Sequence, residues 1–520
     1  MRDVLYASVV RDTASRFAAP FWAALGLNIT ARGQALFAPM YSIDSYDVAR
    51  KSFSGEIAYS LSDGRFIRAA MWWLQAQIGF QPIESMSASM CLSIPLFIIS
   101  GFIFASAILE DLSQQEAFAF AALFTLHPFA TEYFYYGEVT FATVLAVFFA
   151  ALAVWSAYRA PASSLWRFVC IGAVVLALGN YQVVIGHIAA GGLLVLVADL
   201  SVCDNASKSA LSALLGRFLR RTTVLLAGFA VYVLCVISTR YLFPVVASGR
   251  AFRAGPPDLF QKLHTLGAAM RFSFLPQQGI VPTTSIVAIL ALVLGTFLLL
   301  RMTAQRRGNI AALVAALTIV AAMACAAVAP LIGDVAWLAP RLLSPIALCI
   351  AALGVIGFRS AAAKLNLCLV AAFAIVIAGY VGADASILFD QRRMNLWDHQ
   401  EANRIIARLE ADPAFGEARS LAVVGRRKAH PLALGTSSVD MNTSALGSPW
   451  SKLGLFEQAT GYKFATPTDA QWRLAIDYCG HGKTWPLPGS VGLVQELAVV
   501  CLTNAGLAKP GSAQGPGNTD

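Results

Sequence analysis

Long apolar runs recur along this chain, and each comes close to the ~20 residues that an α-helix needs to cross a bilayer core. Six runs are clear, at 91–109, 139–155, 222–239, 285–300, 309–331 and 365–383. Five more are short or interrupted by Pro, Gly or polar residues, at 17–37, 117–134, 168–179, 181–199 and 340–357. The pattern predicts an α-helical polytopic membrane protein with about eleven transmembrane helices.

The pattern changes near residue 388, where the long apolar runs end. We therefore predict a transmembrane domain over 1–388 and a small soluble α/β domain over 389–508. The soluble domain shows helical periodicity and short apolar strand-like runs, at 395–412, 420–425, 468–478 and 493–502. Residues 509–520 are rich in Gly and polar residues, which predicts a disordered tail.

The distribution of Lys and Arg predicts how the helices are oriented, because basic loops stay in the cytoplasm. With the N-terminus inside, four alternate loops are basic, around Arg159, Arg220, Arg306 and Arg359. About eleven crossings then place the 38–90 loop and the whole C-terminal domain on the external side.

Composition agrees with a membrane protein, since 58% of the residues are hydrophobic and only 13% are charged, against about a quarter in soluble domains. The net charge of +9 does not require nucleic-acid binding. Residues 389–520 carry 13 basic and 12 acidic side chains, so nearly all of the excess belongs to the membrane domain.

Seven of the nine cysteines lie in or next to apolar runs, where they serve as small hydrophobic residues. The other two, Cys479 and Cys501, lie in the predicted external domain. An oxidising compartment allows such a pair to form a disulfide, which we expect here.

A polar stretch at 41–75 interrupts the apolar pattern, with the ionisable residues Asp44, Asp47, Arg50, Lys51, Glu56, Asp63, Arg65 and Arg68. Its second half, 63–80, predicts an amphipathic helix lying in the membrane interface. Asp63 fits either the N-cap of this helix or a functional role. Arg65 in the first turn faces the positive end of the helix dipole, which is unfavourable unless an anion binds there.

Chemistry is expected at the external face, because the apolar runs hold few ionisable groups. His187 is the only one well inside a run, and Arg341 begins another. Ion-coupled transporters place charged residues at mid-membrane depth, so this distribution disfavours a transporter. The sequence has no glycine-rich phosphate loop, HExxH motif or CxxC motif.

Several short segments resemble the Gtr-type serotype-converting O-antigen glucosyltransferases. They are "IDSYD" (43–47), "DGRF" (63–66), "LHPFATEYFYYGEVTFATVLAVFFAALAV" (126–154), "GNYQVVIGH" (179–187) and "APRLLSPIAL" (339–348). The resemblance covers most of the chain, including the C-terminal domain. The family's adjacent acidic pair corresponds here to Asp44 and Asp47, with two residues between them, which leaves both as candidates.

The resemblance implies a GT-C membrane glycosyltransferase of the bacterial cytoplasmic (inner) membrane, with a periplasmic C-terminal domain. Such an enzyme transfers a sugar, here expected to be glucose, from a polyprenyl-phosphate donor to an O-antigen-like glycan or lipid-linked glycan. The acceptor hydroxyl needs a general base, for which Asp44 is the first choice and Asp47 the second. The departing phosphate needs cations, for which Arg65 and Arg341 are candidates. Arg68 is weaker, because it could snorkel to lipid headgroups.

The remaining substrate-binding candidates are Asp63, Tyr136, Glu138 and Gln182. Glu138 could orient sugar hydroxyls, whereas the tyrosines around it also fit an aromatic belt at the interface. No metal-binding spacing is present, although Asp44 and Asp47 together could hold a divalent cation weakly.

Two alternative functions remain besides the glycosyltransferase. One is a lipid-linked glycan transporter or flippase, and the other is a non-catalytic assembly factor whose C-terminal domain binds partners.

Overall fold

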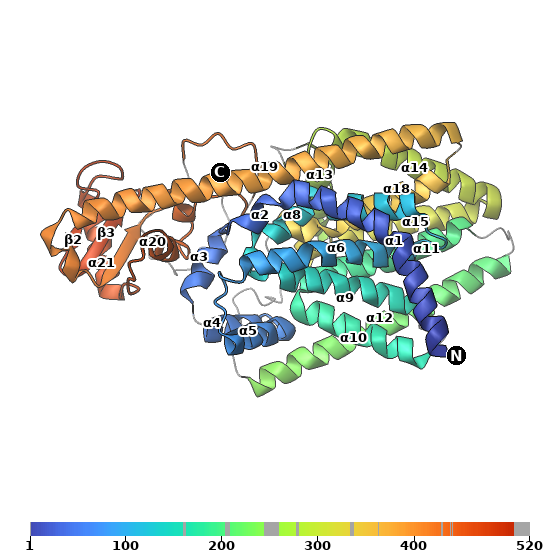
Figure 1. The fold of residues 1–520 in the computed structure, drawn as a ribbon, viewed down its shortest axis with the longest axis horizontal. Helices are drawn as coiled ribbons and strands as arrows, with labels where there is room; N and C mark the ends of the chain where they lie inside the picture. Colours follow the sequence, from blue (N-terminus) through green and yellow to red (C-terminus); the bar gives the residue numbers. More distant parts are fainter. Residues whose placement is uncertain are drawn as a thin grey trace.

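The computed structural model is a bundle of long helices with a small sheet-containing domain beyond one end (Figure 1). It describes residues 2–51, 53–159, 163–202, 208–243, 259–276, 280–332, 337–361, 363–427, 430–436, 438 and 440–503. The predicted disordered tail at 509–520 lies outside the described residues.

Within these residues, eight helical segments are long and apolar enough to cross a membrane. The six clear apolar runs account for six of them, and the runs at 181–199 and 340–357 for the other two. Their main helices are α6 (Met86–Ile108), α9 (Thr140–Arg159), α11 (Ile185–Val202), α12 (Lys208–Leu242), α14 (Ser285–Arg307), α15 (Asn309–Ala326), α18 (Pro345–Arg359) and α19 (Ala363–Glu410). The architecture is that of a helical polytopic membrane protein.

Short turns of helix precede three of these spans, namely η1 (Gly137–Val139), η3 (Gln182–Val184) and α17 (Pro340–Leu343). The bundle also contains α1 (Arg2–Arg32), α7 (Gln114–Thr125), α8 (Pro128–Tyr135), α10 (Ser164–Asn180), α13 (Leu259–Phe274) and α16 (Ala329–Ile332).

The apolar run at 117–134 does not form one helix. It divides into α7 and α8, because His127 has an extended backbone and Pro128 occupies the first turn of α8. Proline has no N–H to donate and disfavours a helical residue before it, so it starts a new helix instead of continuing the old one. The break leaves α7 with 12 residues, well below the length of a single crossing.

The polar stretch at 41–75 folds into three helices at the end of the bundle that carries the C-terminal domain (Figure 1). They are α3 (Ile43–Arg50), α4 (Phe53–Ser62) and α5 (Phe66–Ile78), and the short α2 (Gln34–Phe37) precedes them. A capping box starts α3, in which the hydroxyls of Ser42 and Ser45 each accept a hydrogen bond from the other residue's backbone N–H. The sequence signal of polarity therefore marks a folded helical layer.

The predicted start of the interfacial helix was wrong by two residues. Arg65, not Asp63, occupies the N-cap of α5, and its side chain makes no capping hydrogen bond. Gly64 has a φ of +76°, a left-handed conformation that ends the preceding turn and prevents the helix from starting at Asp63. The exposed side chains of Trp73, Leu74 and Ile78 give α5 the apolar outer face expected of an interfacial helix.

The C-terminal domain contains a three-stranded sheet of β1 (Ser420–Val424), β2 (Val491–Val494) and β3 (Leu497–Cys501). The strand order is β1-β3-β2, with β1 parallel and β2 antiparallel to β3. The apolar run at 493–502 is a hairpin, because Gln495 takes a positive φ of 58° and turns the chain. The other elements are α20 (Lys452–Thr460), α21 (Asp469–His481), η4 (Pro413–Glu417) and η5 (Ala445–Gly447).

A disulfide joins Cys479 of α21 to Cys501 of β3, the pair that the sequence analysis expected. Their Cα atoms lie 5.4 Å apart, within the usual range for this bond. The link fixes α21 against the sheet, where both cysteines belong to a small buried cluster with Ala422, Val424 and Leu497.

Helix α19 runs without a break from the bundle into the C-terminal domain (Figure 1). The predicted boundary at residue 388 falls inside this helix. Three polar residues spaced seven apart anchor it along its length. Asp384 pairs with Arg32, Gln391 donates to the carbonyl of Tyr135, and Asp398 accepts from Ser444 and from the N–H of Ala445.

Candidate functional site

Arg341 lies in a charge-compensated position between the bundle and the C-terminal domain. Its guanidinium forms ion pairs with Glu132 of α8 and, at 2.9 Å, with Asp440 of the C-terminal domain. It also donates to Tyr136 Oη at 2.8 Å and lies over the rings of Tyr136 and Trp337. Two carboxylates and two aromatic rings therefore surround this one cation.

A second group of cations surrounds Tyr181, just before η3. The guanidinium carbons of Arg65 and Arg68 lie 5.6 Å and 5.4 Å from the centre of its ring. Arg65 Nε donates to Gln182 Oε1 at 3.0 Å, and Gln182 Nε2 donates to the carbonyl of Asp63 at 2.6 Å. Gln182 thus holds the start of α5 against η3.

Arg68 is the least compensated cation of the site. Only 7% of it is exposed, and its Nη2 donates to the hydroxyl of Thr143 at 3.1 Å. Within the described residues its buried Nε has no hydrogen-bond partner, and no carboxylate forms an ion pair with it. Burial, with the neighbouring charge of Arg65, lowers the pKa of Arg68 to about 10. Of the two alternatives left open for Arg68, its burial favours a role inside the protein over snorkelling to headgroups.

Asp44 and Asp47 lie on the same helix but have different partners. Asp47 forms an ion pair with Lys51, one turn along α3. Asp44 accepts a hydrogen bond of 2.9 Å from the indole N–H of Trp450, which belongs to the C-terminal domain. Asp47 therefore has a partner on its own helix, whereas Asp44 has a partner from the C-terminal domain.

Two further carboxylates lie close to α3. Glu138 accepts a 2.8 Å hydrogen bond from Ser45 Oγ, and only 7% of it is exposed. Glu56 is equally buried, and its carboxylate lies 4.0 Å from Lys51 Nζ. Burial raises the pKa of Glu56 above its usual value, although Lys51 partly opposes this shift.

Tyr136 and Tyr181 connect these groups into one polar region. Burial raises the pKa of Tyr136 well above its usual range, and the negative charges of Glu132, Asp440 and Asp44 add to the shift. Burial also raises the pKa of Tyr181, while the positive charges of Arg341 and Arg65 oppose it. Such mutual effects require the charged groups to lie near each other.

All eight of the predicted catalytic and substrate-binding residues lie at this end of the bundle. Arg341 is hydrogen-bonded to Tyr136. Arg65 contacts both Asp63 and Gln182. Asp44 and Asp47 both lie on α3. Four residues of the site were not selected from the sequence: Glu132, Tyr181, Asp440 and Trp450. Glu132 and Tyr181 lie inside the quoted segments 126–154 and 179–187, whereas Asp440 and Trp450 lie in irregular chain that carries no such signal.

A buried ion pair was also missed in the bundle. Arg32 of α1 and Asp384 of α19 are fully buried and lie 2.8 Å apart. Arg32 also donates to the hydroxyl of Thr131 and to the carbonyl of Thr125. The bundle therefore holds more charge than the sequence analysis counted, because Arg32 lies inside the apolar run at 17–37 and Asp384 directly follows the run at 365–383.

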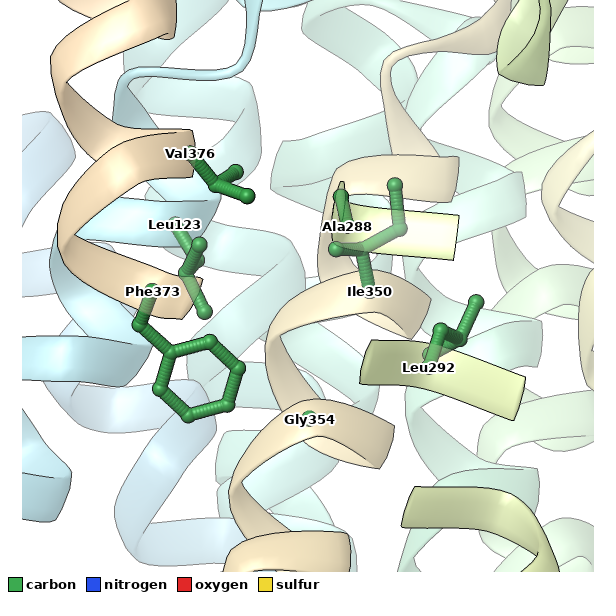
Figure 2. Close-up of a pocket in the computed structure, with 7 residues that line it drawn as sticks. All are labelled: Leu123, Ala288, Leu292, Ile350, Gly354, Phe373 and Val376. Carbon is green, nitrogen blue, oxygen red and sulfur yellow. The ribbon is translucent and has the colours of Figure 1, made fainter. Parts of the chain in front are cut away.

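An apolar cavity lies between helices of the bundle, and none of the predicted site residues lines it (Figure 2). It is lined by Leu123, Ala288, Leu292, Ile350, Gly354, Phe373 and Val376, and its volume is about 10 Å³. That volume is at the lower limit for one water molecule, and an apolar lining disfavours even that.

Within the described part of the chain, no three His, Cys, Asp or Glu side chains gather as a metal site. Comparison with protein-family models, with curated proteins and with solved structures finds no match.

Proposed function

We propose that this chain is a GT-C-type glycosyltransferase that transfers a sugar, glucose first of all, from a polyprenyl-phosphate donor to an O-antigen-like glycan acceptor. We place the reaction at the outer face of a bacterial inner membrane, with the C-terminal domain in the periplasm. The observation that carries the proposal is Arg68, a buried guanidinium without a carboxylate partner beside a second cation, Arg65. A buried charge of this kind is costly unless an anion accompanies it, and the phosphate of the donor supplies that anion.

The proposed reaction is a displacement at the anomeric carbon of the donor sugar. The acceptor hydroxyl oxygen forms a bond to this carbon as the bond to the phosphate oxygen breaks. The hydroxyl proton passes to a carboxylate, and the bonding electrons leave with the polyprenyl phosphate. Arg65 and Arg68 stabilise the negative charge that develops on the phosphate. Arg341, the other cation expected to meet the phosphate, is already paired with Glu132 and Asp440.

Asp44 is the proposed general base, and Asp47 is the second candidate. Asp47 already forms an ion pair with Lys51 on its own helix. Asp44 receives its hydrogen bond from a neutral indole and lies nearer to the C-terminal domain, from which we expect the acceptor to approach.

The other predicted residues have proposed binding or positioning roles. Glu138, held by Ser45, orients hydroxyls of the donor sugar. Tyr136 and Gln182 position Arg341 and Arg65 through their hydrogen bonds. Asp63 helps to orient Arg65, whose guanidinium lies 3.5 Å from its carboxylate.

The test compares Asp44→Asn with Asp47→Asn in membranes that contain radiolabelled polyprenyl-phosphate glucose and an O-antigen acceptor. Asp44→Asn keeps the size of the side chain but removes the base, so turnover should fall by about 10²–10⁴-fold with unchanged folded protein. Asp47→Asn should have a much smaller effect. The reverse result assigns the base to Asp47, and full activity in both variants contradicts the catalytic proposal.

The buried pair of Arg32 and Asp384 favours a second candidate, a lipid-linked glycan transporter, because charged pairs inside membrane proteins mark transport pathways in many cases. A transporter would move a fluorescent polyprenyl-linked glycan across proteoliposomes without any sugar donor, and Asp384→Asn would abolish this movement. Transfer of labelled glucose without movement of the lipid supports the glycosyltransferase instead.

A further inference from the structure

Trp450 occupies the place where the C-terminal domain meets the proposed general base. Its indole N–H donates to Asp44 at 2.9 Å, yet half of the residue remains exposed. One edge of the ring is thus fixed by a hydrogen bond, while much of its surface stays open beside the carboxylate.

The support beneath Trp450 is closely packed. Helix α20, which begins two residues later, lies so near α3 that a Cβ added at Gly454 would come within 1.9 Å of the carbonyl oxygen of Tyr46. Arg50 of α3 ties the same domain down through Glu457, Thr466 and the carbonyl of Phe464. Trp450 is therefore held at a fixed place over α3 and does not hang from a loose loop.

The surroundings of Trp450 differ from those of the exposed aromatic residues that face lipid. Trp73 on α5 lies beside the exposed Leu74 and Ile78, which together form an apolar face. Trp450 instead has Pro449 and Ser451 as its chain neighbours and Asp44 at its edge. An aromatic face with a carboxylate at its rim does not suit a lipid tail.

A sugar ring matches this combination. It presents C–H groups on one face, which pack on an aromatic ring, and hydroxyls at its edge, which hydrogen-bond to a carboxylate. We infer that Trp450 forms the acceptor subsite, where its indole ring stacks on a sugar residue of the acceptor glycan and brings a hydroxyl to Asp44. This inference rests on the proposed function and adds that the C-terminal domain binds the acceptor.

Side-chain footprinting tests the contact itself. The detergent-solubilised full chain is oxidised with hydroxyl radicals, with and without the O-polysaccharide released from lipopolysaccharide by mild acid, and each tryptophan is quantified by mass spectrometry. Oxidation of Trp450 should fall several-fold, whereas Trp472, a half-buried tryptophan on α21, should not change. Unchanged oxidation of Trp450 at a polysaccharide concentration that saturates transfer overturns the inference.

The kinetics of two variants distinguish a Trp450 that stacks on the acceptor sugar from a Trp450 that only positions Asp44. Trp450→Ala should raise the KM for the polysaccharide by roughly 5- to 10-fold, with the KM for the donor unchanged. Trp450→Phe keeps an aromatic face but loses the N–H, so it should retain most of the acceptor affinity. Equal losses of kcat in both variants, without a change in acceptor KM, would mean that Trp450 only positions Asp44.

The same assays distinguish this inference from the proposed function. Wild-type protein that transfers no sugar contradicts the proposed function, whatever Trp450 does. Wild-type protein that transfers sugar while Trp450→Ala keeps the normal acceptor KM contradicts only the acceptor subsite.

Discussion

Two buried arginines at the same end of the bundle have opposite surroundings. Arg341 has Glu132 and Asp440 as ion-pair partners, and it links the bundle to the C-terminal domain. Arg68 is at least as buried, but within the described residues no carboxylate forms an ion pair with it. It donates to the hydroxyl of Thr143 and lies over the ring of Tyr181, with the cation Arg65 nearby. The difference teaches that a compensated arginine is needed by the carboxylates it is paired with, whereas an uncompensated one needs a ligand.

Removal of Arg341 should have the largest effect on stability. Arg341→Met leaves the fully buried Glu132 without its main partner, which should lower the free energy of unfolding by about 3–5 kcal/mol. Denaturant titration in detergent micelles measures the loss. The double variant with Glu132→Leu should recover most of it, because the fully buried carboxylate is then absent as well. A stable single variant would show that Arg341 is not held as described.

Loss of the disulfide should have the second-largest effect on stability. It should weaken the C-terminal domain, which supplies the Asp440 partner of Arg341. The bond closes a 22-residue separation between Cys479 and Cys501, so Cys→Ser changes at both should cost about 3 kcal/mol. The domain that supplies Asp440 is weakened, and Arg68 is not touched. Limited proteolysis of the C-terminal domain measures the effect, with Cys91→Ala as the control. Alkylation of Cys479 and Cys501 themselves in the non-reduced protein, located by mass spectrometry, would contradict the pairing.

We expect Arg68 to matter for the stability of the ligand-bound protein but not for that of the ligand-free protein. Arg68→Met should leave the stability of the ligand-free protein unchanged or slightly higher, since a buried uncompensated charge disappears. A short-chain polyprenyl phosphate at 100 times its Kd should stabilise the wild type by about 2.7 kcal/mol and the variant much less. Thermal unfolding with and without the lipid measures this. Arg159→Met, which removes an arginine stacked on Trp155 at the other end of α9, is the matched control.

Lys452 should give the smallest effect. It is a buried cation whose ammonium group donates to the backbone carbonyls of Val423 and Gly425. Burial lowers its pKa from 10.5 to about 8 in the folded protein, with Arg426 adding to the shift. Between pH 8 and pH 10.5 the unfolded chain binds more protons than the folded one, so the free energy of unfolding should rise with pH across this window. Below about pH 8 Lys452 is charged in both states, and the full cost of burying its charge lowers the stability. The Tm difference between wild type and Lys452→Met should shrink with rising pH; a constant difference would contradict the buried charge.

The sequence indicated much of the architecture because it depends on local patterns. Apolar length predicts spans, and the change of period near residue 388 predicted a second type of structure, a small sheet with helices. The failures also have local causes. Gly64 delayed the start of α5, Pro128 divided one apolar run into two helices, and Gln495 turned one predicted strand into a hairpin.

The site was less accessible to prediction, because its decisive contacts join distant parts of the chain. Asp440 meets Arg341 across 99 positions, and Trp450 meets Asp44 across 406. Arg68 could be read as a snorkelling residue because its helix has an apolar outer face, and only the packing of α5 against the bundle shows that it points inward. Polarity in the sequence located the region but not the partners.

The unbroken course of α19 sets the register between the two parts of the molecule. Each residue of this 48-residue helix advances the chain by about 1.5 Å and rotates it by about 100°. A spacing of seven residues is close to two helical turns, so one face of α19 carries Asp384, Gln391 and Asp398. This face contacts the rest of the protein where the helix leaves the bundle. The number of residues between Asp384 and Asp398 therefore works as a ruler. It fixes both the distance along the axis of α19 and the rotation about that axis at which the C-terminal domain places Trp450 over α3.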